Sequence, residues 1–411
     1  MLVGGLLIAS LAVGMLVRRI ASGGRDQVPK SDQPIVSRIT FNHHIAPILY
    51  EHCVGCHRPG PAASFGLVNY GEVKERAEAI LKAVQDESMP PWLPDRGASS
   101  FLGERGLTPG QVALIREWVE EGSLEGEPAD LPKIVLPPAG WSGGTPSFVI
   151  NLALPDSKLP NSEGETLSLA LAFRGSGRIK GIEFQVSDPR LVRLIALQVV
   201  GKRPQEPLSN SQPQLGSIQP VLFPEGQIPV WSPGKPTFVP TPGWELKEPS
   251  DFELRVATLP SGQASVGTIA VGVYRDPDPA PSLTKNIRLT ARRDDELQSA
   301  VVSYELPTAA SALSVFAAGP DSLQRLELRA KFPNGETTSL LAIRNWNPRW
   351  QDAYRYAAPI PLPQGTVLSV FHLERPATNG LASPTATRAA VLPEVVLQVQ
   401  VATPADLEKL P

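Results

Sequence analysis

The sequence is poor in the side chains that bind metals or cross-link a chain. Its 411 residues include only two cysteines, five histidines and three methionines. Charged residues make up 19% of the sequence, and the formal net charge is −3. Without a basic excess, the chain is not expected to bind nucleic acid. A chain of this length can bury the cores of two or three domains, so it can be stable without a disulfide.

Both cysteines lie in one pentapeptide, Cys53-Val-Gly-Cys56-His57. The spacing C-x-x-C-H is the attachment signature of c-type haem. In this interpretation Cys53 and Cys56 form thioethers to the haem, and His57 is the proximal iron ligand. A structural zinc site would need about four ligands, and a thioredoxin-type dithiol would begin a helix in a βαβ unit. We therefore predict one covalent haem c, an electron carrier with no catalytic residues, and a periplasmic location, because such haem is attached outside the cytoplasm.

The distal iron ligand is predicted by elimination. Met89 is the only methionine outside the first 15 residues, and it lies in Ser-Met-Pro-Pro-Trp. Two prolines after it make a stiff, extended loop that suits a thioether held against a planar cofactor. We predict that Met89 and His57 bind the iron, which favours a relatively positive potential. A distal His43 or His44 and an open iron remain alternatives, whereas His52 adjoins Cys53 and is too close to reach the distal face.

The first part of the chain predicts an anchor followed by helices. Residues 1–17 carry no charge, which is near the lower limit for a spanning helix. Helical spacing and a Thr108-Pro109 start predict helices at Phe41–Glu51 and Tyr70–Asp86 and a last helix ending at Gly122. The predicted segments are a transmembrane anchor or signal-anchor at 1–21, a linker at 22–37 and an all-α cytochrome c haem domain at 38–130.

The larger part of the chain is strand-like. Short runs rich in Val, Ile, Leu and Phe alternate with turn residues. These runs are Phe148–Leu154, Leu191–Val200, Phe252–Ala257, Thr268–Tyr274, Leu323–Phe332, Val367–His372 and Ala390–Val401. They predict β-sandwich domains at 140–278 and 285–405. The predicted fold class is therefore multidomain: an N-terminal membrane anchor helix, an all-α cytochrome c domain and all-β tandem sandwich or jelly-roll domains.

Several motifs carry a resemblance to one family. They are Ile39-Thr-Phe-Asn42, Ile45-Ala-Pro-Ile-Leu49, Cys53-Val-Gly-Cys-His-Arg-Pro-Gly60, Met89-Pro-Pro-Trp-Leu-Pro94, Leu259-Pro-Ser-Gly-Gln263, Phe332-Pro-Asn-Gly335, the run Trp346, Trp350-Gln351 and Tyr354, and Leu362-Pro-Gln-Gly-Thr366. With them the chain resembles bacterial haem-containing, copper type II ascorbate-dependent monooxygenase-like proteins. The resemblance implies a tandem of jelly-roll-like β domains after the haem segment.

The departures from that family concern its copper ligands. The resemblance matches the family's ligands to Arg193-Leu194, to Ala257 and Leu259, and to Ser314, Val315 and Phe316, none of which is a histidine or methionine. The one histidine beyond His57 is His372, which we expect to be an ordinary surface or edge residue. Copper sites of this type need several imidazoles and a soft ligand, so a copper monooxygenase is not expected. Three carboxylates in polar turns are expected to be solvated, namely Asp251, Asp294 and Asp295.

These observations predict a membrane-tethered monohaem carrier of single electrons. Its expected partners are other electron-transfer proteins or a membrane redox complex, such as a photosynthetic reaction centre or a respiratory complex. In that role the copper-less β region serves for docking. The alternative is a mainly structural or assembly subunit of such a complex.

Overall fold

The computed structural model describes residues 38–58, 65–134, 140–154, 166–171, 177–189, 192–200, 230–235, 238–246, 251–258, 267–277, 283–291, 302–375 and 392–411. The predicted anchor at 1–21 and linker at 22–37 lie outside the described residues. So do Leu259 and the turns that contain Asp294 and Asp295.

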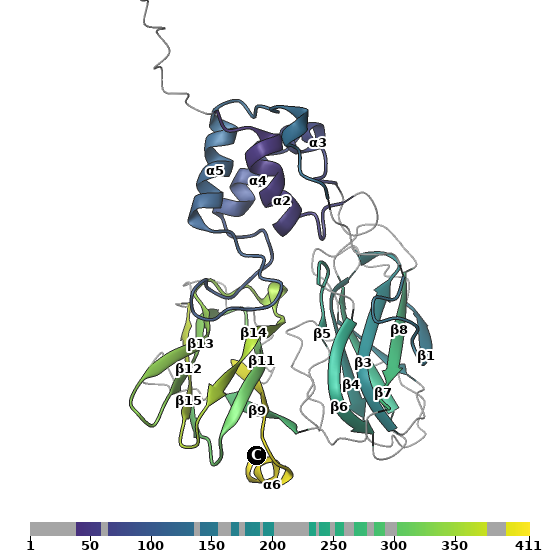
Figure 1. Cartoon of the computed structure of the whole chain (residues 1–411), viewed down its shortest axis with the longest axis vertical. Helices are drawn as coiled ribbons and strands as arrows, with labels where there is room; N and C mark the ends of the chain where they lie inside the picture. The colour runs from purple at the N-terminus through teal and green to yellow at the C-terminus, as the bar shows by residue number, and fades with distance from the viewer. Residues whose placement is uncertain are drawn as a thin grey trace, which may run out of the picture. The chain divides into compact units, whose positions relative to one another are not determined.

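Residues 39–134, called the helical segment below, carry most of the described helices (Figure 1). They are the π-helix η1 (Phe41–Ile45), α2 (Ala46–His52), α3 (Tyr70–Glu75), α4 (Ala77–Gln85), α5 (Pro109–Glu120) and the 3-10 turn η2 (Pro128–Asp130). Helix α5 begins with a capping box: the Gln111 amide donates to Thr108 Oγ1 at 3.1 Å, and the Thr108 amide donates to Gln111 Oε1 at 2.8 Å. The predicted helix at Tyr70–Asp86 is interrupted at Arg76, which separates α3 from α4.

The helical segment has its own apolar core. Phe41, Leu49 and Trp118 are at most 1% exposed and belong to one cluster with Ile45 and Ile115. The amides of Phe41 and Asn42 donate to the carbonyls of Leu124 and Glu125, so the chain after α5 returns to the start of η1. At the opposite ends of these helices, His52 at the end of α2 contacts Gln111 in the first turn of α5. The turn after α2 therefore lies beside the start of α5.

The following eight strands form two packed sheets. They are β1 (Phe148–Ala153), β2 (Thr166–Leu171), β3 (Gly177–Val186), β4 (Val192–Val200), β5 (Val230–Trp231), β6 (Phe238–Leu246), β7 (Asp251–Thr258) and β8 (Thr268–Arg275). The sheet orders are β1-β8-β3-β6 and β2-β7-β4-β5, with antiparallel pairing. This is the strand order of a jelly roll. Its core includes Phe184, Ile195 and Leu254, each fully buried.

The last eight strands repeat this architecture. They are β9 (Thr284–Thr290), β10 (Val302–Glu305), β11 (Ala310–Ala318), β12 (Leu323–Lys331), β13 (Thr337–Ile343), β14 (Ala353–Leu362), β15 (Val367–Glu374) and β16 (Glu394–Gln400), with η4 (Pro348–Trp350) before β14 and α6 (Pro404–Lys409) at the end. The sheets are β10-β15-β12-β13 and β14-β11-β16-β9. When each set of eight is numbered from its own first strand, the two orders are identical. We call β1–β8 the first jelly roll and β9–β16 the second jelly roll.

The helical segment contributes side chains to the core of the second jelly roll. Leu93 and Phe101 are buried in that core, and Trp92 packs against it. A bridge pairs Phe101 with Tyr356, and the Leu102 amide donates to the Arg355 carbonyl at 2.8 Å. Residues 39–411 accordingly form one compact unit.

These contacts correct the predicted fold class. The predicted β sandwiches are present, but a separate all-α cytochrome domain is not, because the helical segment is part of the same compact unit as the sheets. Helical periodicity reports only which face of a helix is apolar, and it cannot reveal that Phe101 packs against strands about 250 positions later.

The predicted transmembrane helix is also not carried by the described part of the chain. Within the described ranges, no helix combines the length and apolar character that crossing a membrane requires.

Candidate functional site

The Cys53–His57 turn follows directly after α2. Cys53 is the C-cap of that helix, and its amide donates to the Leu49 carbonyl at 2.8 Å. The amides of Cys56 and His57 then donate to the Cys53 carbonyl at 3.1 and 2.9 Å. These bonds fold the pentapeptide into a tight turn. Both sulfurs are free thiols and partly buried.

The surroundings of the two thiols keep them protonated. Burial raises the pKa of Cys53 to about 12, and the neighbouring Cys56 adds to the shift. Burial also raises the pKa of Cys56, although Arg105 and Arg58 oppose the shift. In addition, the C-terminal end of a helix carries the negative end of its dipole, which disfavours a thiolate. Reactive dithiols require the opposite, a depressed pKa at a helix N-terminus, so the turn does not fit thiol–disulfide exchange.

His57 is held as a neutral, partly buried ring. Burial lowers the pKa of its imidazole, and the ring packs on Phe65 with centroids 4.6 Å apart. Its Nδ1 atom is buried without a hydrogen-bond partner among the described residues. A neutral imidazole is the form that binds metals. Two protonated thiols and this ring are therefore the side chains that a covalently attached c-type haem needs.

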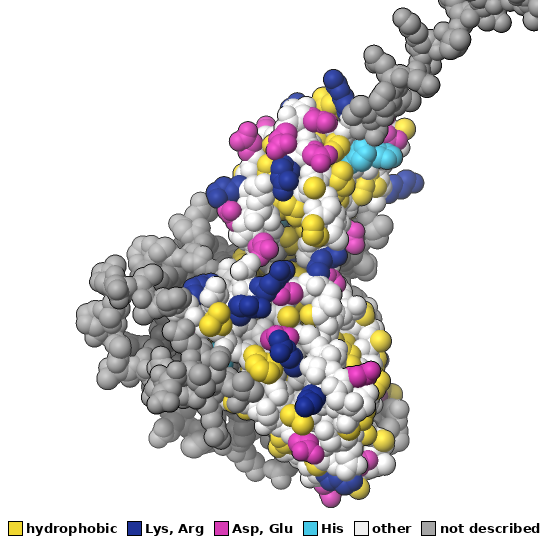
Figure 2. Space-filling model, turned by 90° about the vertical axis from the view of Figure 1, so that its left-hand side faces the viewer, with side chains coloured by type: hydrophobic (Ala, Val, Ile, Leu, Met, Phe, Trp, Pro, Cys, Tyr) yellow, Lys and Arg dark blue, Asp and Glu magenta, His cyan; other side chains and the backbone are white. Residues whose placement is uncertain are grey.

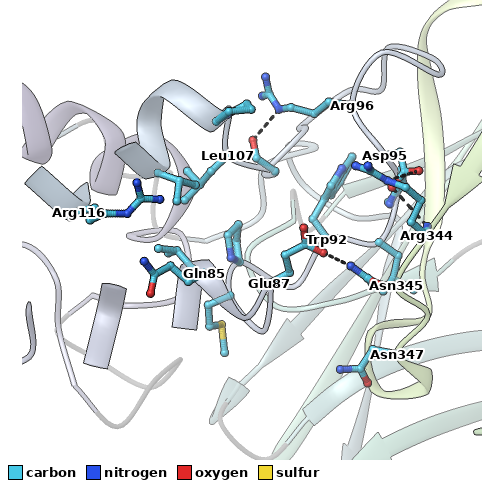
Figure 3. Close-up of a pocket in the computed structure, with 18 residues that line it drawn as sticks. Gln85, Glu87, Trp92, Asp95, Arg96, Leu107, Arg116, Arg344, Asn345 and Asn347 are labelled. Carbon is cyan, nitrogen blue, oxygen red and sulfur yellow. Dashed lines mark hydrogen bonds and ion pairs between the residues drawn. The ribbon is translucent and has the colours of Figure 1, made fainter. Parts of the chain in front are cut away.

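Met89 lines a pocket of about 560 Å³ (Figure 3). Apolar side chains of Val84, Trp92, Leu107 and Val112 contribute to its wall. Polar side chains also line it, including Glu87, Arg96, Arg116, Arg344 and Asn345. This volume lies in the range of cofactor and small-molecule sites. Met89 is half-buried there, so its thioether borders a space that could receive a ligand.

The motif and the Met89 pocket are neighbours rather than one site. Cys53, Cys56 and His57 do not belong to the pocket lining. Leu107 and Val112 connect the two, because they line the pocket and also pack on the core that Cys53 contacts.

The three other histidines of the helical segment have structural partners. His43 is exposed and lies 3.7 Å from Asp130. His44 Nδ1 accepts from the Thr40 amide at 3.1 Å. His52 is buried, with Nδ1 3.1 Å from the Arg105 carbonyl and Nε2 3.1 Å from Gln111 Nε2. These contacts favour Met89 over His43 and His44 as the distal ligand.

The prediction for His372 is wrong. It lies in β15, which has a neighbouring strand on both sides, and only 8% of it is exposed. Its Nδ1 is buried without a hydrogen-bond partner among the described residues. The strand-like run around it was identified, but alternation alone could not show which face of the strand points inward. Asp251 begins β7.

The described residues contain no metal centre built from protein side chains. Nowhere in these ranges do three or more His, Cys, Asp or Glu side chains gather so that they could hold a metal ion. The prediction of a metal-binding protein thus gains no support from a cluster of protein ligands in the described ranges. Three positions that the resemblance matches to copper ligands, Leu194, Ala257 and Phe316, instead belong to one buried apolar cluster between the two jelly rolls.

Sequence reasoning missed the residues around Cys56. A turn of the first jelly roll at Gly234 and the side chain of Arg105 both approach its sulfur. Asp352 of the second jelly roll lies beside Arg105, with Asp352 Oδ2 3.9 Å from Arg105 Nη2. The Ser-Pro-Gly-Lys pattern identifies a turn at Gly234, but no sequence signal shows what that turn contacts.

Comparison with known proteins gives no family. No protein-family model and no curated protein matches the chain. Among solved structures it is similar to the major capsid protein P2 from Bacteriophage PM2, with 10% identity over 62% of this chain and 99% of that chain and a TM-score of 0.26. It is also similar to an allantoicase (9% identity, 53% and 77% covered, TM-score 0.17) and to PBCV-1 VP54 fitted into a reconstruction of the virophage Sputnik (7%, 62% and 95%, TM-score 0.21). Likenesses with such low TM-scores carry no argument about family or function.

Proposed function

We propose that the protein is a one-electron carrier with a single c-type haem attached through Cys53 and Cys56. The observation that supports this most is the Cys53–His57 turn. It presents two unpaired thiols with raised pKa values and an imidazole whose pKa burial lowers, all within five residues. When bound, the haem supplies an iron that gains and loses one electron.

The residues of the chain would have separate tasks in this role. Cys53 and Cys56 would hold the cofactor, His57 would ligate iron from the proximal side, and the half-buried Met89 would ligate it from the distal side. The apolar wall around Met89, including Val84, Leu107 and Val112, would keep water from the thioether–iron bond.

The proposed partners are other electron-transfer proteins or a membrane redox complex, on the extracytoplasmic side. On the face that Figure 2 shows, Lys and Arg side chains are interspersed with Asp and Glu side chains. Such a mixed surface fits docking to a protein better than binding to a polyanion. A mainly structural role in such a complex is the second candidate, and co-purification in mild detergent would distinguish a stable complex from a transient one.

The proposal is tested by covalent haem content. The full chain is produced in cells with c-type haem maturation and analysed by pyridine haemochrome and by haem staining after denaturation. One haem c per chain is expected, with none after C53A/C56A. A chain without covalent haem and with two titratable thiols would contradict the proposal.

The Met89 assignment is tested separately with Met89→Leu. This variant keeps the volume of the side chain and removes the sulfur, so the haem content should be unchanged while the reduction potential falls. An unchanged potential and spectrum would instead favour ligation by His43 or His44.

A further inference from the structure

Three parts of the chain meet at the sulfur of Cys56. A methyl group placed on Gly234 would lie 2.6 Å from Cys56 Sγ and 2.8 Å from Arg105 Nη1. A larger residue at Gly234, in a turn of the first jelly roll, would therefore require the Cys56 or Arg105 side chain to move. Gly55 of the motif touches the same turn, since its own Cβ position is 3.6 Å from the Gly234 backbone.

The Arg105 side chain is fixed in this contact and is only 11% exposed. Its Nη1 donates to the Pro233 carbonyl at 2.9 Å, and its positive charge opposes the rise that burial causes in the pKa of Cys56. Nε is buried and has no partner in the described ranges. A guanidinium does not lose its proton in a protein, so a permanent positive charge lies beside the sulfur.

The Asp352 carboxylate lies close to two cationic side chains, Arg105 and Lys235. Asp352 is 4% exposed, and its Oδ2 lies 3.9 Å from Arg105 Nη2 and accepts from Ser232 Oγ at 2.8 Å. Its Oδ1 lies 2.7 Å from Lys235 Nζ. Burial and the neighbouring Arg105 lower the pKa of Lys235, with Asp352 opposing the shift, whereas the Arg105 guanidinium stays charged. Arg105 is therefore the permanent positive charge of this cluster.

We propose that Arg105 is a positioning residue of the haem site, which holds Cys56 against the β sheets and raises the reduction potential of the haem attached there. The inference rests on the proposed function. A buried cation favours the reduced iron, which carries one positive charge fewer, and Coulomb interactions are weakly screened away from water. The surroundings of a haem are among the features by which a protein sets its potential.

The experiment measures the midpoint potential of the purified full chain by spectroelectrochemical titration, after its covalent haem content has been determined. Arg105→Gln removes the charge and should lower the equilibrium constant for reduction about threefold, which is about 28 mV at 59 mV per tenfold for one electron. Arg105→Lys keeps the charge and should restore most of that loss. Asp352→Asn removes the compensating charge and should shift the potential in the opposite direction.

Arg275→Gln is the matched control, because Arg275 is exposed at the end of β8 and does not belong to the described cluster around Cys56. Its potential should equal that of the wild type. If the wild type carries no haem, the proposed function and this inference both fail. If haem is present and Arg105→Gln and Arg105→Lys have equal potentials, only the inference fails. Should Arg105→Gln not fold, Asp352→Asn decides, since a potential that does not rise overturns the inference.

Discussion

The two jelly rolls share one strand order, but they meet the helical segment in different ways. The second jelly roll takes Trp92, Leu93 and Phe101 into its own core, where rings of Phe101 and Tyr356 stack with centroids 5.2 Å apart. Among the described residues, the first jelly roll approaches the Cys53–His57 turn at Gly234. With the same topology, the second jelly roll therefore shares its core with the helical segment, whereas the first jelly roll contacts the Cys53–His57 turn.

The two contacts of the helical segment, one with each jelly roll, should respond differently to substitution. Apolar burial is spread over many atoms and stabilises the compact unit as a whole. The turn at Gly234 buries little but limits what can stand beside Cys56. Changes at the two places should have different consequences for stability and for haem.

The largest expected effect is that of Phe101→Ala. Removing a buried phenylalanine costs about 3–5 kcal/mol of unfolding free energy, and Phe101 is 5% exposed in the core of the second jelly roll. In urea unfolding, the helical signal at 222 nm and the tryptophan fluorescence should move together to lower urea, because one compact unit unfolds.

Phe371→Ala is the control for this change. Phe371 lies on the same jelly roll but is only partly buried, with the Arg329 guanidinium 4.7 Å from its ring centroid. It should cost about 1 kcal/mol. A helical transition that stays in place in Phe101→Ala would mean that the helical segment folds independently.

Alanine substitutions at two glycines, one in each jelly roll, should have intermediate effects on the free energy of unfolding. Gly234 and Gly335 both have positive φ, +83° and +90°, and lie in turns of the first and second jelly rolls. Alanine at either site costs about 1–2 kcal/mol for the left-handed backbone. At Gly335 no atom lies within 4 Å of the added carbon, whereas at Gly234 it overlaps Cys56 and Arg105.

We therefore expect Gly234→Ala to lose about 1–3 kcal/mol more than Gly335→Ala, and to reduce covalent haem content. Denaturant unfolding and haemochrome analysis measure the two quantities. Equal costs and equal haem content would show that the turn does not constrain the motif.

The smallest expected effects depend on pH and have opposite signs in the two regions. Burial lowers the pKa of His52, with Glu51 opposing the shift. The unfolded chain then binds more protons below about pH 6.5, so the helical segment loses stability as the pH falls through this range. The contacts of the ring favour a single proton, since Nδ1 faces the Arg105 carbonyl and Nε2 faces the Gln111 amide nitrogen. The Glu51 carboxylate, 3.6 Å from Nε2, opposes this effect.

Glu394, in β16, behaves in the opposite way. Burial raises the pKa of its carboxyl group, although Arg288 opposes the shift. The folded chain binds more protons above about pH 4.5, so acidification stabilises the second jelly roll there. Urea midpoints at pH 7.5 and 5.0 should fall less in His52→Gln than in the wild type and fall more in Glu394→Gln. Identical pH dependences in all three proteins would contradict both assignments.

Much of the secondary structure could be predicted because it depends on neighbours in the sequence. The alternation of Leu323, Leu326, Leu328 and Ala330 with polar residues matches the burial of β12. Its pairing has one irregularity with β15 and another with β13. Thr108 and Pro109 mark the start of α5 because capping is a local interaction. The break at Arg76 and the packing of Phe101 into the second jelly roll depend on tertiary contacts, which a periodic pattern does not contain.

The candidate site divides in the same way. Cys53, Cys56 and His57 could be singled out because the C-x-x-C-H spacing is local to the sequence, and their role in haem attachment stays a prediction. The sequence did not indicate the cluster of Arg105, Gly234 and Asp352. These residues lie on three different parts of the chain, and only the folded structure brings them together. The link between Met89 and the motif through Leu107 and Val112 likewise depends on how α5 packs.

The apolar cluster between the jelly rolls also limits how this chain could change over evolutionary time. Leu194, Ala257 and Phe316 are each at most 2% exposed there. A histidine at any one of them would bury a polar ring without a partner, which costs stability before any metal could repay it. A single histidine substitution at Leu194, Ala257 or Phe316 should therefore lower the free energy of unfolding instead of creating a metal site.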